Sequence, residues 1–495
     1  NSMISYIKIV DFDEHSRCQN RETMQMNKNQ EQLSLFLDWL QWNKVELRGC
    51  SIKYADKSKG LGVFSSPRPH NEQVHLVVPL DLAITPMRVL QDSFIGPHCR
   101  AMFEEGEVDD RFLITLFLLT ERLRKNSTWK PYLDMLPSEF GNPLWFTEEE
   151  LSYLKGSALY NATQLQKKQL LSLYHEKVEN MIKNVLAKDG DCEGEVRFED
   201  FLWANSVFWS RAMNIPLPHS YVFPSNDSTN HDTVWVEGII PAIDFCNHGI
   251  VSQATWEVDV TGSSSGVPFS MYLLSGTYSI VADDNPSLVE REIHINYGKK
   301  GNEELLYLYG FVINDNPDDY LMIHYPVEAL QNVVFADSKM QILQAQNAEL
   351  RHLLPKSLLH QKGKTVFPED LISPLRIISM EEHQVHQFSS LLLETTENGE
   401  RQPTHEEVRA AVLDICGNSK ALQLLVDLLQ KRLMDLEEHS GTEDCDSVLL
   451  NRSDVVLSPN KWSSIVYRRG QKQLAKAFLK EAQHALGLSL TQQIE

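Results

Sequence analysis

The sequence has little cysteine and no excess of positive charge. Its 495 residues include 7 cysteines, and no two of them have the CxxC spacing. This argues against a disulfide framework and against a cysteine-ligated zinc site. The chain has 46 Lys and Arg against 68 Asp and Glu, a net charge of −22. A chain this acidic repels nucleic acids and anionic membranes at long range. We therefore expect no metal site, and no nucleic acid or membrane among its partners.

Long hydrophobic runs are also missing. The longest, 112–119, is shorter than the roughly 18 residues needed to cross a bilayer. The first residues contain no basic stretch followed by an apolar one, as a secretory signal would. We therefore expect an intracellular soluble protein, a monomer of the cytoplasm or nucleus. A chloroplast location stays open, because a processed plastid protein would look the same.

Several common catalytic motifs are absent: G-x-S-x-G, H-E-x-x-H, the P-loop and the kinase set. The only G-x-G is Gly60-Leu61-Gly62, and Ser65 stands where a dinucleotide fingerprint needs its third glycine. A Rossmann site is therefore disfavoured. A G-x-G between short strands still allows the backbone to approach a ligand closely.

The pattern of the sequence changes along its length. Residues 1–32 are polar and weakly patterned and are expected to be a flexible N-terminal segment. Short β-prone runs occupy 45–85 and return at 233–296, with helical periodicity between them. The simplest account is one β domain interrupted by a helical insert. Helices are expected at 30–42, from 109, at 162–186 and at 198–213, and strands at 51–54, 62–65, 74–78, 233–240, 255–260, 268–274, 278–282 and 291–296.

After about residue 317 the chain is expected to be helical to its end. Thr404 and Glu407 have the spacing of a capping box. A solvated face is the favoured interpretation of the basic last helix, 461–486, and contact with an acidic partner is the alternative. The leucines of one helical stripe are Leu422, Leu425, Leu429, Leu433 and Leu436, and the basic residues of the last helix are Lys461, Arg468, Arg469, Lys472, Lys476 and Lys480.

Three stretches combine polar and aromatic residues in an unusual way. An apolar run ends in DFCNH at 244–248, which places hydrogen-bonding side chains at the edge of a core, where they need partners. Taken alone, a polar turn with satisfied hydrogen bonds explains this stretch. A strand that begins near 291 ends in YG at 297–298, and YGF follows at 309–311. Each tyrosine alone is uninformative, since most tyrosines are core or interface residues.

Taken together with GLGVF at 60–64, these stretches resemble the SET-domain protein methyltransferases. The split β region and the helical C-terminal part are similar to the subclass of the Rubisco large-subunit lysine methyltransferase, and YRRGQK at 467–472 resembles part of its substrate-binding domain. The resemblance implies an α+β fold: a SET-type β fold interrupted by a helical insert (iSET), followed by an all-α C-terminal substrate-binding domain. The expected boundaries are 33–312 for the SET domain, with the insert at about 98–232, and 313–495 for the Rubisco LSMT-like domain.

The resemblance also implies a cofactor, S-adenosylmethionine (SAM), and roles for individual residues. No metal ligand is among them. Trp256 departs from the subclass, which places a tyrosine before the acid at this point. The residues implied for cofactor binding are Gly60, Leu61, Gly62, Arg211, Asp244, Asn247, His248 and Tyr297; Tyr297 is also the catalytic residue, and the substrate channel is formed by Trp256, Tyr309 and Phe311.

The implied activity is SAM-dependent protein-lysine N-methylation of a non-histone protein, so the expected partner is a protein that bears the target lysine. A neutral amine must be held in line with the methyl group, so positioning is the main task. The lysine ammonium, with a reference pKa of about 10.4, must first lose a proton, and an aromatic channel disfavours its charged form. Two alternatives stay open: a catalytically silent SET scaffold or assembly subunit, and a histidine-directed methyltransferase.

Overall fold

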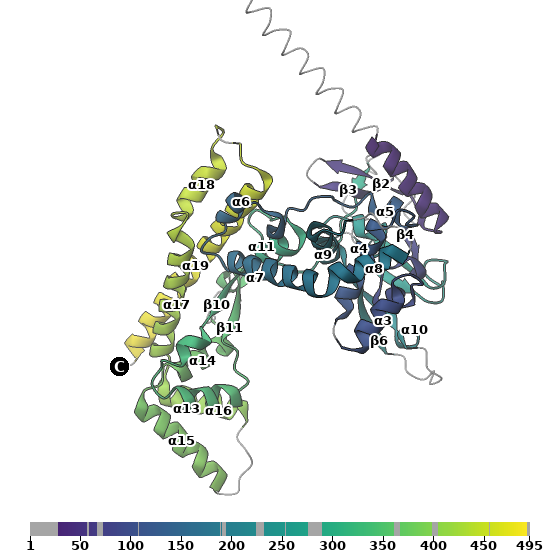
Figure 1. Cartoon of the computed structure of the whole chain (residues 1–495). Coiled ribbons are helices and arrows are strands. Elements are labelled where there is room, and N and C mark those ends of the chain that lie inside the picture. The colour runs from purple at the N-terminus through teal and green to yellow at the C-terminus, as the bar shows by residue number, and fades with distance from the viewer. Residues whose placement is uncertain are drawn as a thin grey trace, which may run out of the picture. The chain divides into compact units, whose positions relative to one another are not determined.

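A computed structural model describes residues 28–56, 59–66, 73–106, 108–188, 190, 195–223, 232–252, 254–275, 290–360, 367–397, 404–454 and 456–492. The chain forms two compact units (Figure 1). The first contains residues 1–140 and 167–299, and the second contains 141–166 and 300–495. The strand predicted at 278–282 lies outside the described residues, as does most of the predicted N-terminal segment. In the part of the chain that the structure describes, no helix is both long and apolar enough to span a bilayer.

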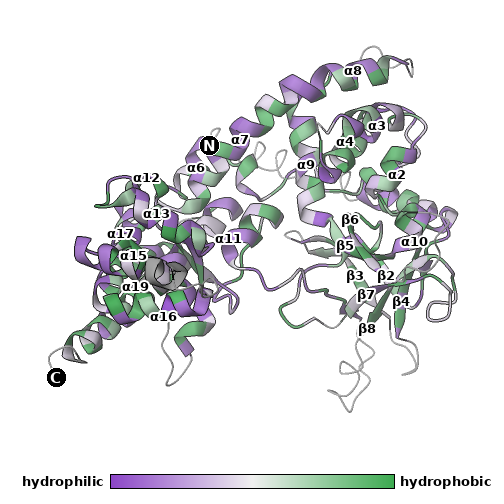
Figure 2. Ribbon diagram, turned by 90° about the horizontal axis from the view of Figure 1, so that it is seen from below, coloured by the Kyte–Doolittle hydropathy of each residue, from purple (hydrophilic) through white to green (hydrophobic). Residues whose placement is uncertain are grey.

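The β structure of the first unit joins strands from both sides of a long helical stretch. In one sheet β4 pairs with β8, with Val77 opposite Tyr272, and in another β3 pairs with β9, with Phe64 opposite Glu292. Hydrophobic residues dominate β4 and β8 (Figure 2). The predicted β fold interrupted by helices is therefore confirmed. Its strands are β1 (Glu46–Leu47), β2 (Cys50–Asp56), β3 (Gly60–Ser65), β4 (Val74–Pro79), β5 (Met213–Pro218), β6 (Thr233–Gly238), β7 (Ala254–Asp259), β8 (Ser270–Ser275) and β9 (Arg291–Glu292).

The helices of the first unit pack through aromatic side chains. The rings of Phe112 in α4 and Phe201 in α9 lie 6.3 Å apart between centroids. Trp203 is fully buried, and its indole N–H donates to the carbonyl oxygen of Pro137 at 2.8 Å. The helix predicted over 162–186 is interrupted by a π-helical turn, Tyr174–Val178. The helices are a first one at residues 28–42, then α2 (Pro86–Gln91), α3 (Gly96–Glu104), α4 (Asp110–Leu123), α5 (Lys130–Leu133), α7 (Ala158–Leu173), whose start belongs to the second unit, α8 (Glu179–Lys188), α9 (Phe198–Arg211) and α10 (His219–Val222).

The second unit is helical, as predicted, with one addition. An antiparallel pair, β10 (Tyr320–His324) and β11 (Arg351–Pro355), interrupts the helices. The capping box is confirmed: Glu407 N donates to Thr404 Oγ1 at 3.3 Å, and Thr404 N donates to the Glu407 carboxylate at 2.7 Å. The helices are α6 (Glu148–Ser152), α11 (Asn302–Glu304), α12 (Val327–Leu330), α13 (Ala336–Ala345), α14 (Glu369–Ile378), α15 (Glu382–Glu397), α16 (His405–Cys416), α17 (Ser419–Glu438), α18 (Glu443–Asn451) and α19 (Pro459–Gln492).

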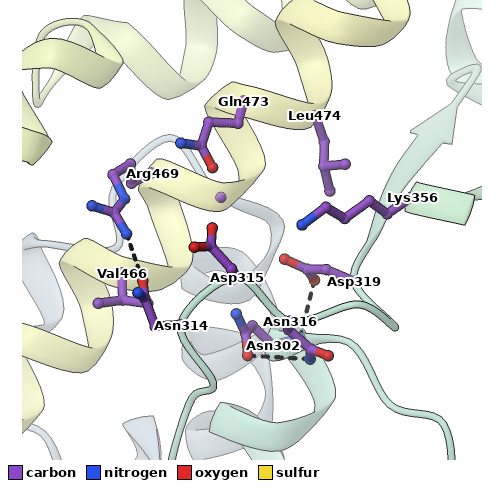
Figure 3. A pocket seen from close by; sticks show the side chains of 11 residues that line it. Asn302, Asn314, Asp315, Asn316, Asp319, Lys356, Val466, Arg469, Gln473 and Leu474 are labelled. Atoms are coloured by element: carbon purple, nitrogen blue, oxygen red, sulfur yellow. Dashed lines mark hydrogen bonds between the residues drawn. The ribbon is translucent and has the colours of Figure 1, made fainter. Parts of the chain in front are cut away.

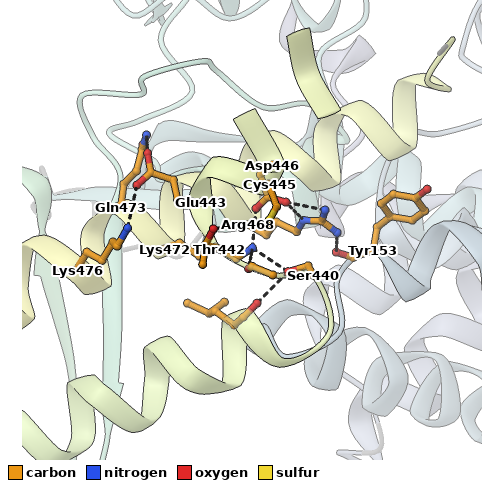
Figure 4. Close-up of polar contacts among 12 residues, drawn as sticks. Tyr153, Ser440, Thr442, Glu443, Cys445, Asp446, Arg468, Lys472, Gln473 and Lys476 are labelled. Carbon is orange, nitrogen blue, oxygen red and sulfur yellow. Dashed lines mark hydrogen bonds and ion pairs between the residues drawn. The ribbon is translucent and has the colours of Figure 1, made fainter. Parts of the chain in front are cut away.

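Two of the six basic residues of α19 are buried, so the interpretation of its basic face as solvated is wrong for these two. Lys472 is fully buried and Arg468 nearly so. Both bind the buried carboxylate of Asp446 in α18, Lys472 at 2.7 Å and Arg468 at 2.6 Å (Figure 4). This network neutralises two of the basic residues within the chain, and contact of the remaining ones with an acidic partner stays a prediction. Lys461 likewise pairs with Glu149 of α6 at 2.6 Å.

A second buried acid, Asp319, lines a small polar pocket beside α19 (Figure 3). Its Oδ1 accepts hydrogen bonds from the backbone N–H groups of Asn302 and Tyr320, at 3.0 and 3.2 Å. A Cβ added to Gly470 would lie 3.2 Å from Asp319 Oδ2, so the glycine lets the helix approach closely. Burial raises the pKa of Asp319 to about 6.

Asp319→Asn is expected to stabilise the protein at pH 8 and to change nothing near pH 4. The ordinary aspartate pKa is about 3.9, so between pH 4 and 6 the unfolded carboxyl ionises while the folded one stays protonated. Wild type therefore loses stability across this window, up to about 2–3 kcal/mol. The asparagine keeps the acceptor oxygen and does not ionise. Urea denaturation of both proteins at pH 4, 6 and 8 checks this; a stability difference that is the same at all three pH values contradicts it.

Candidate active site

Three stretches that are far apart in the sequence meet in the first unit. The first is β3 with Gly60–Gly62, the second follows the short turn Ile243–Phe245, and the third runs from β9 to Tyr297. Backbone hydrogen bonds join them: Ile293 N donates to Val63 O at 2.7 Å, and Ile295 N donates to Asn247 O at 3.1 Å. The predicted motifs at 60–62, 244–248 and 297 therefore lie together.

Gly60 and Gly62 are required for different reasons, one for its backbone conformation and the other for lack of space. Gly60 opens β3 with φ +72°, in the left-handed region that glycine adopts without strain. At Gly62 an added Cβ would lie 2.8 Å from Glu292 Oε1 and 3.3 Å from Asn247 Nδ2. The backbone at Gly62 is therefore in close contact with the side chains of the other two stretches.

Asn247 is held by two acceptors. Its Nδ2 donates to the backbone oxygen of Leu61 at 3.2 Å and to Glu292 Oε1 at 2.6 Å. Because both neighbours can only accept, the amide nitrogen must face them. The side-chain oxygen is left as the acceptor end of Asn247. Glu292 was not predicted as a site residue, because one acid in a strand carries no signal without its partner.

His248 and Tyr297 are neighbours. The backbone N–H of Tyr297 donates to His248 Nδ1 at 3.2 Å, and the ring centroids lie 5.2 Å apart. The Tyr297 hydroxyl donates to the backbone oxygen of Cys246 at 2.7 Å. Burial raises the pKa of the Cys246 thiol well above its usual value, so this cysteine stays protonated and is a poor nucleophile.

Arg211, at the end of α9, is fixed by a buried acid. Its Nη1 donates to the carboxylate and to the backbone oxygen of Asp244, both at 2.9 Å. Tyr132 also donates to this carboxylate, at 2.8 Å. Burial raises the pKa of Asp244, and the nearby guanidinium of Arg211 opposes this. Tyr132 was missed by the sequence analysis, because it lies 112 positions from its partner.

The residues assigned to the substrate channel fall in different units. Trp256 lies in β7 of the first unit, where its indole N–H donates to the backbone oxygen of Asn214 at 3.0 Å. Tyr309 and Phe311 belong to the second unit, with ring centroids 6.2 Å apart. Burial raises the pKa of Tyr309 to about 12. Between these two residues, Gly310 is left-handed, and its carbonyl oxygen would lie 2.4 Å from a Cβ on Gly141. The role of all three aromatic residues in a channel stays a prediction.

No group of three or more His, Cys, Asp or Glu side chains placed to hold a metal ion occurs among the described residues. The site consists instead of an asparagine, a histidine, an arginine and a tyrosine around a close backbone approach. This arrangement, on a β fold interrupted by helices and followed by a helical unit, agrees with the SET-type domain and helical C-terminal domain that the sequence resemblance implies.

Comparisons with known proteins agree with this class. A family model described as "Rubisco LSMT substrate-binding" matches residues 331–474. The chain is 27% identical over 314 residues to the chloroplastic Rubisco large subunit N-methyltransferase of Pisum sativum, covering 63% of this chain and 57% of that protein. It is 25% identical over 361 residues to the human actin-histidine N-methyltransferase, covering 71% and 53%. The chain thus spans about half the length of the curated relatives it matches.

The fold agrees as well. A solved structure of Rubisco LSMT bound to AdoMet matches with a TM-score of 0.66 at 20% identity, covering 92% of each chain. The comparisons therefore show a similarity to Rubisco LSMT in residues 331–474 and in the fold of the chain.

Proposed function

We propose that this chain is a SAM-dependent protein methyltransferase that modifies a lysine side chain of a non-histone protein. The observation that carries the proposal is the meeting of Asn247, His248 and Tyr297 beside the close backbone approach at Gly60–Gly62. It is supported by the relatives, which are named as methyltransferases of Rubisco, of ribosomal lysine and of actin histidine.

The residues of the first unit fit SAM as a ligand. Among the described residues, Asp244 occupies only Nη1 of Arg211, so the guanidinium keeps further donors for the carboxylate of the cofactor. The side-chain oxygen of Asn247 can accept a hydrogen bond from a nitrogen donor of SAM. The backbone at Gly60–Gly62 can approach the cofactor closely, because its two glycines carry no side chain. When bound, SAM supplies a methyl group on a sulfonium, which is already a good leaving group.

Tyr297 is proposed to orient the amine. Its hydroxyl hydrogen is committed to the carbonyl oxygen of Cys246, so the phenol oxygen can accept a hydrogen bond from an amine N–H. An accepted hydrogen bond directs the nitrogen lone pair without removing a proton, and positioning is the dominant contribution to this reaction. The role of Trp256, Tyr309 and Phe311 as an aromatic channel that would disfavour the lysine ammonium stays a prediction.

The second unit is proposed to dock the protein substrate. The sequence predicts the boundary between the SET domain and the substrate-binding domain at residue 313. In the packing of the chain, residues 141–166 and 300–312 also belong to the second unit. The net charge of −22 supports a cationic target, because an acidic surface attracts a lysine-bearing segment over long range. We propose a monomer that acts without nucleic acid or membrane, in the cytoplasm or nucleus, with the chloroplast as the alternative.

Histidine is the second candidate target. The match to the human actin-histidine N-methyltransferase covers more of this chain, 71%, than the match to the pea Rubisco large subunit N-methyltransferase, 63%. Lysine is preferred because two of the relatives, the ribosomal lysine and the aldolase-lysine N-methyltransferases, are named for lysine and are 26% and 27% identical to this chain. A silent scaffold is less well supported, since a scaffold has no need of the Asn247, His248 and Tyr297 arrangement.

SAM binding and methyl transfer together test the proposal. Calorimetry of the purified chain is expected to show SAM binding at one site. Incubation with methyl-labelled SAM and a protein extract is expected to label protein, and labelling should disappear when the extract is treated with protease. If the chain neither binds SAM nor labels any protein, the proposed function is overturned. Binding without labelling, across extracts of several sources, would leave only the scaffold alternative.

A further inference from the structure

Glu292 lies at the centre of the candidate site, although no motif points to it. It belongs to β9, where its backbone pairs with Phe64 of β3. Its side chain is only 13% exposed. One carboxylate oxygen, Oε1, accepts from Asn247 at 2.6 Å, and the other lies 3.6 Å from Lys59 Nζ and 3.3 Å from His294 Nε2. A partly buried carboxylate is costly unless it is paired, and here each of its two oxygens has a partner.

The hydrogen bonds of Asn247 depend on this carboxylate. An amide side chain can present either its nitrogen or its oxygen to a neighbour, and the neighbours decide which. Here the carbonyl of Leu61 and the carboxylate of Glu292 take both hydrogens of Nδ2. Among the described residues no donor reaches Asn247 Oδ1. Without Glu292, a single acceptor would remain to hold the amide, and either rotamer could form.

Gly62 supports the same geometry from the other side. A Cβ at this position would lie 2.8 Å from Glu292 Oε1, which is closer than real Cβ contacts come. The second glycine of the Gly60-Leu61-Gly62 stretch therefore makes room for the carboxylate that holds Asn247. Two independent features, a glycine and a partly buried acid, thus fix one amide orientation.

We infer that Glu292 is a positioning residue: it locks the Asn247 amide so that the side-chain oxygen is the end offered to the cofactor. The inference rests on the proposed function. A locked acceptor selects a hydrogen-bond donor, and SAM carries donors at the ammonium of its methionine part, the hydroxyls of its ribose and the amine of its adenine. Orientation is set before binding, so the free energy of binding is not spent on turning the amide.

Calorimetry with SAM and with methylthioadenosine, which lacks the methionine ammonium, tests the inference. Glu292→Ala is expected to weaken SAM binding about tenfold. Glu292→Gln can still accept from Asn247 through its own amide oxygen and should stay within about threefold of wild type. Gly62→Ala, which pushes on the same contact, should weaken binding as Glu292→Ala does. If methylthioadenosine binding is unchanged in Glu292→Ala, the donor is the ammonium; if it weakens equally, the donor lies in the adenosine part of the cofactor.

The matched control is Glu290→Ala, in the same stretch of chain. Glu290 forms an exposed ion pair with Lys53, and its loss should leave SAM binding unchanged. Coupling provides the sharper readout: in an Asn247→Ala background, Glu292→Ala should cause no further weakening, because the amide it holds is gone. A merely structural role would give additive losses instead.

The outcomes separate the inference from the function it rests on. If wild type does not bind SAM, the proposed function fails. If wild type binds and Glu292→Ala and Gly62→Ala both bind as tightly, or if the losses from Asn247→Ala and Glu292→Ala simply add, the inference is overturned while the function stands. Should Glu292→Ala not fold, Glu292→Gln decides the question: binding within about threefold of wild type is expected, and a loss of about tenfold would overturn the inference.

Discussion

Replacing Tyr297 by phenylalanine is expected to slow methyl transfer by about 100-fold or more while SAM affinity stays within about threefold of wild type. The substitution removes only the hydroxyl that donates to the Cys246 carbonyl at 2.7 Å. An amine that loses its acceptor is no longer held in line, and misplacement of about 1 Å can cost about 100-fold in rate. Single-turnover transfer and calorimetry on the same protein measure the two quantities separately.

Tyr272→Phe is the matched control for this prediction. Tyr272 is a buried tyrosine of β8 in the same unit, and its hydroxyl donates to Glu257 at 2.7 Å. Glu257 is not assigned to the site, so Tyr272→Phe should transfer methyl groups at the wild-type rate. Full activity of Tyr297→Phe would refute the assignment of Tyr297, and a loss of SAM binding in it would show that the hydroxyl acts on the cofactor instead.

Asp446→Asn is expected to destabilise the second unit by about 3–5 kcal/mol. Asp446 is fully buried and binds two cations, Arg468 and the fully buried Lys472. Neutralising the acid leaves both charges buried without their counter-charge, which is far more costly than the loss of an exposed ion pair. Hydrogen exchange of α18 and α19 reports this unit directly, because exchange follows local opening.

Asp454→Asn provides the comparison. Asp454 pairs with Arg452 at 2.6 Å on the exposed surface, and exposed pairs contribute little. Its variant should exchange as slowly as wild type. Equal protection of α19 in the Asp446 and Asp454 variants would show that the buried network does not hold the second unit together.

Local pattern predicted much of the fold. The strands at β3, β4, β7 and β8 and the helices at α4 and α9 have periodicities that identify them one by one. The β10–β11 pair was missed, because its strands are five residues each and are held by a partner about 30 positions away, which no short window reveals. Two basic residues of α19 were misread for the same reason, since the acid that binds them lies in another helix.

Some residues of the candidate site could be predicted from the sequence and others could not. Asn247, His248 and Tyr297 could be assigned because their stretches resemble a family, and the structure brings these stretches together. Glu292 and Tyr132 could not, because their importance depends on distant partners, Asn247 and Asp244. Residues that hold other residues in place have weak sequence signals, since their own type is common and only the contact is specific.

The proposed lysine methylation is tested most directly by tandem mass spectrometry of protein labelled by this chain with heavy-methyl SAM. Fragment masses locate the methyl group on one side chain. We predict that it lies on a lysine nitrogen, and that the same peptide stays unlabelled with Tyr297→Phe. A methyl group on histidine would contradict the lysine assignment, and labelling that is equal with Tyr297→Phe would contradict the site.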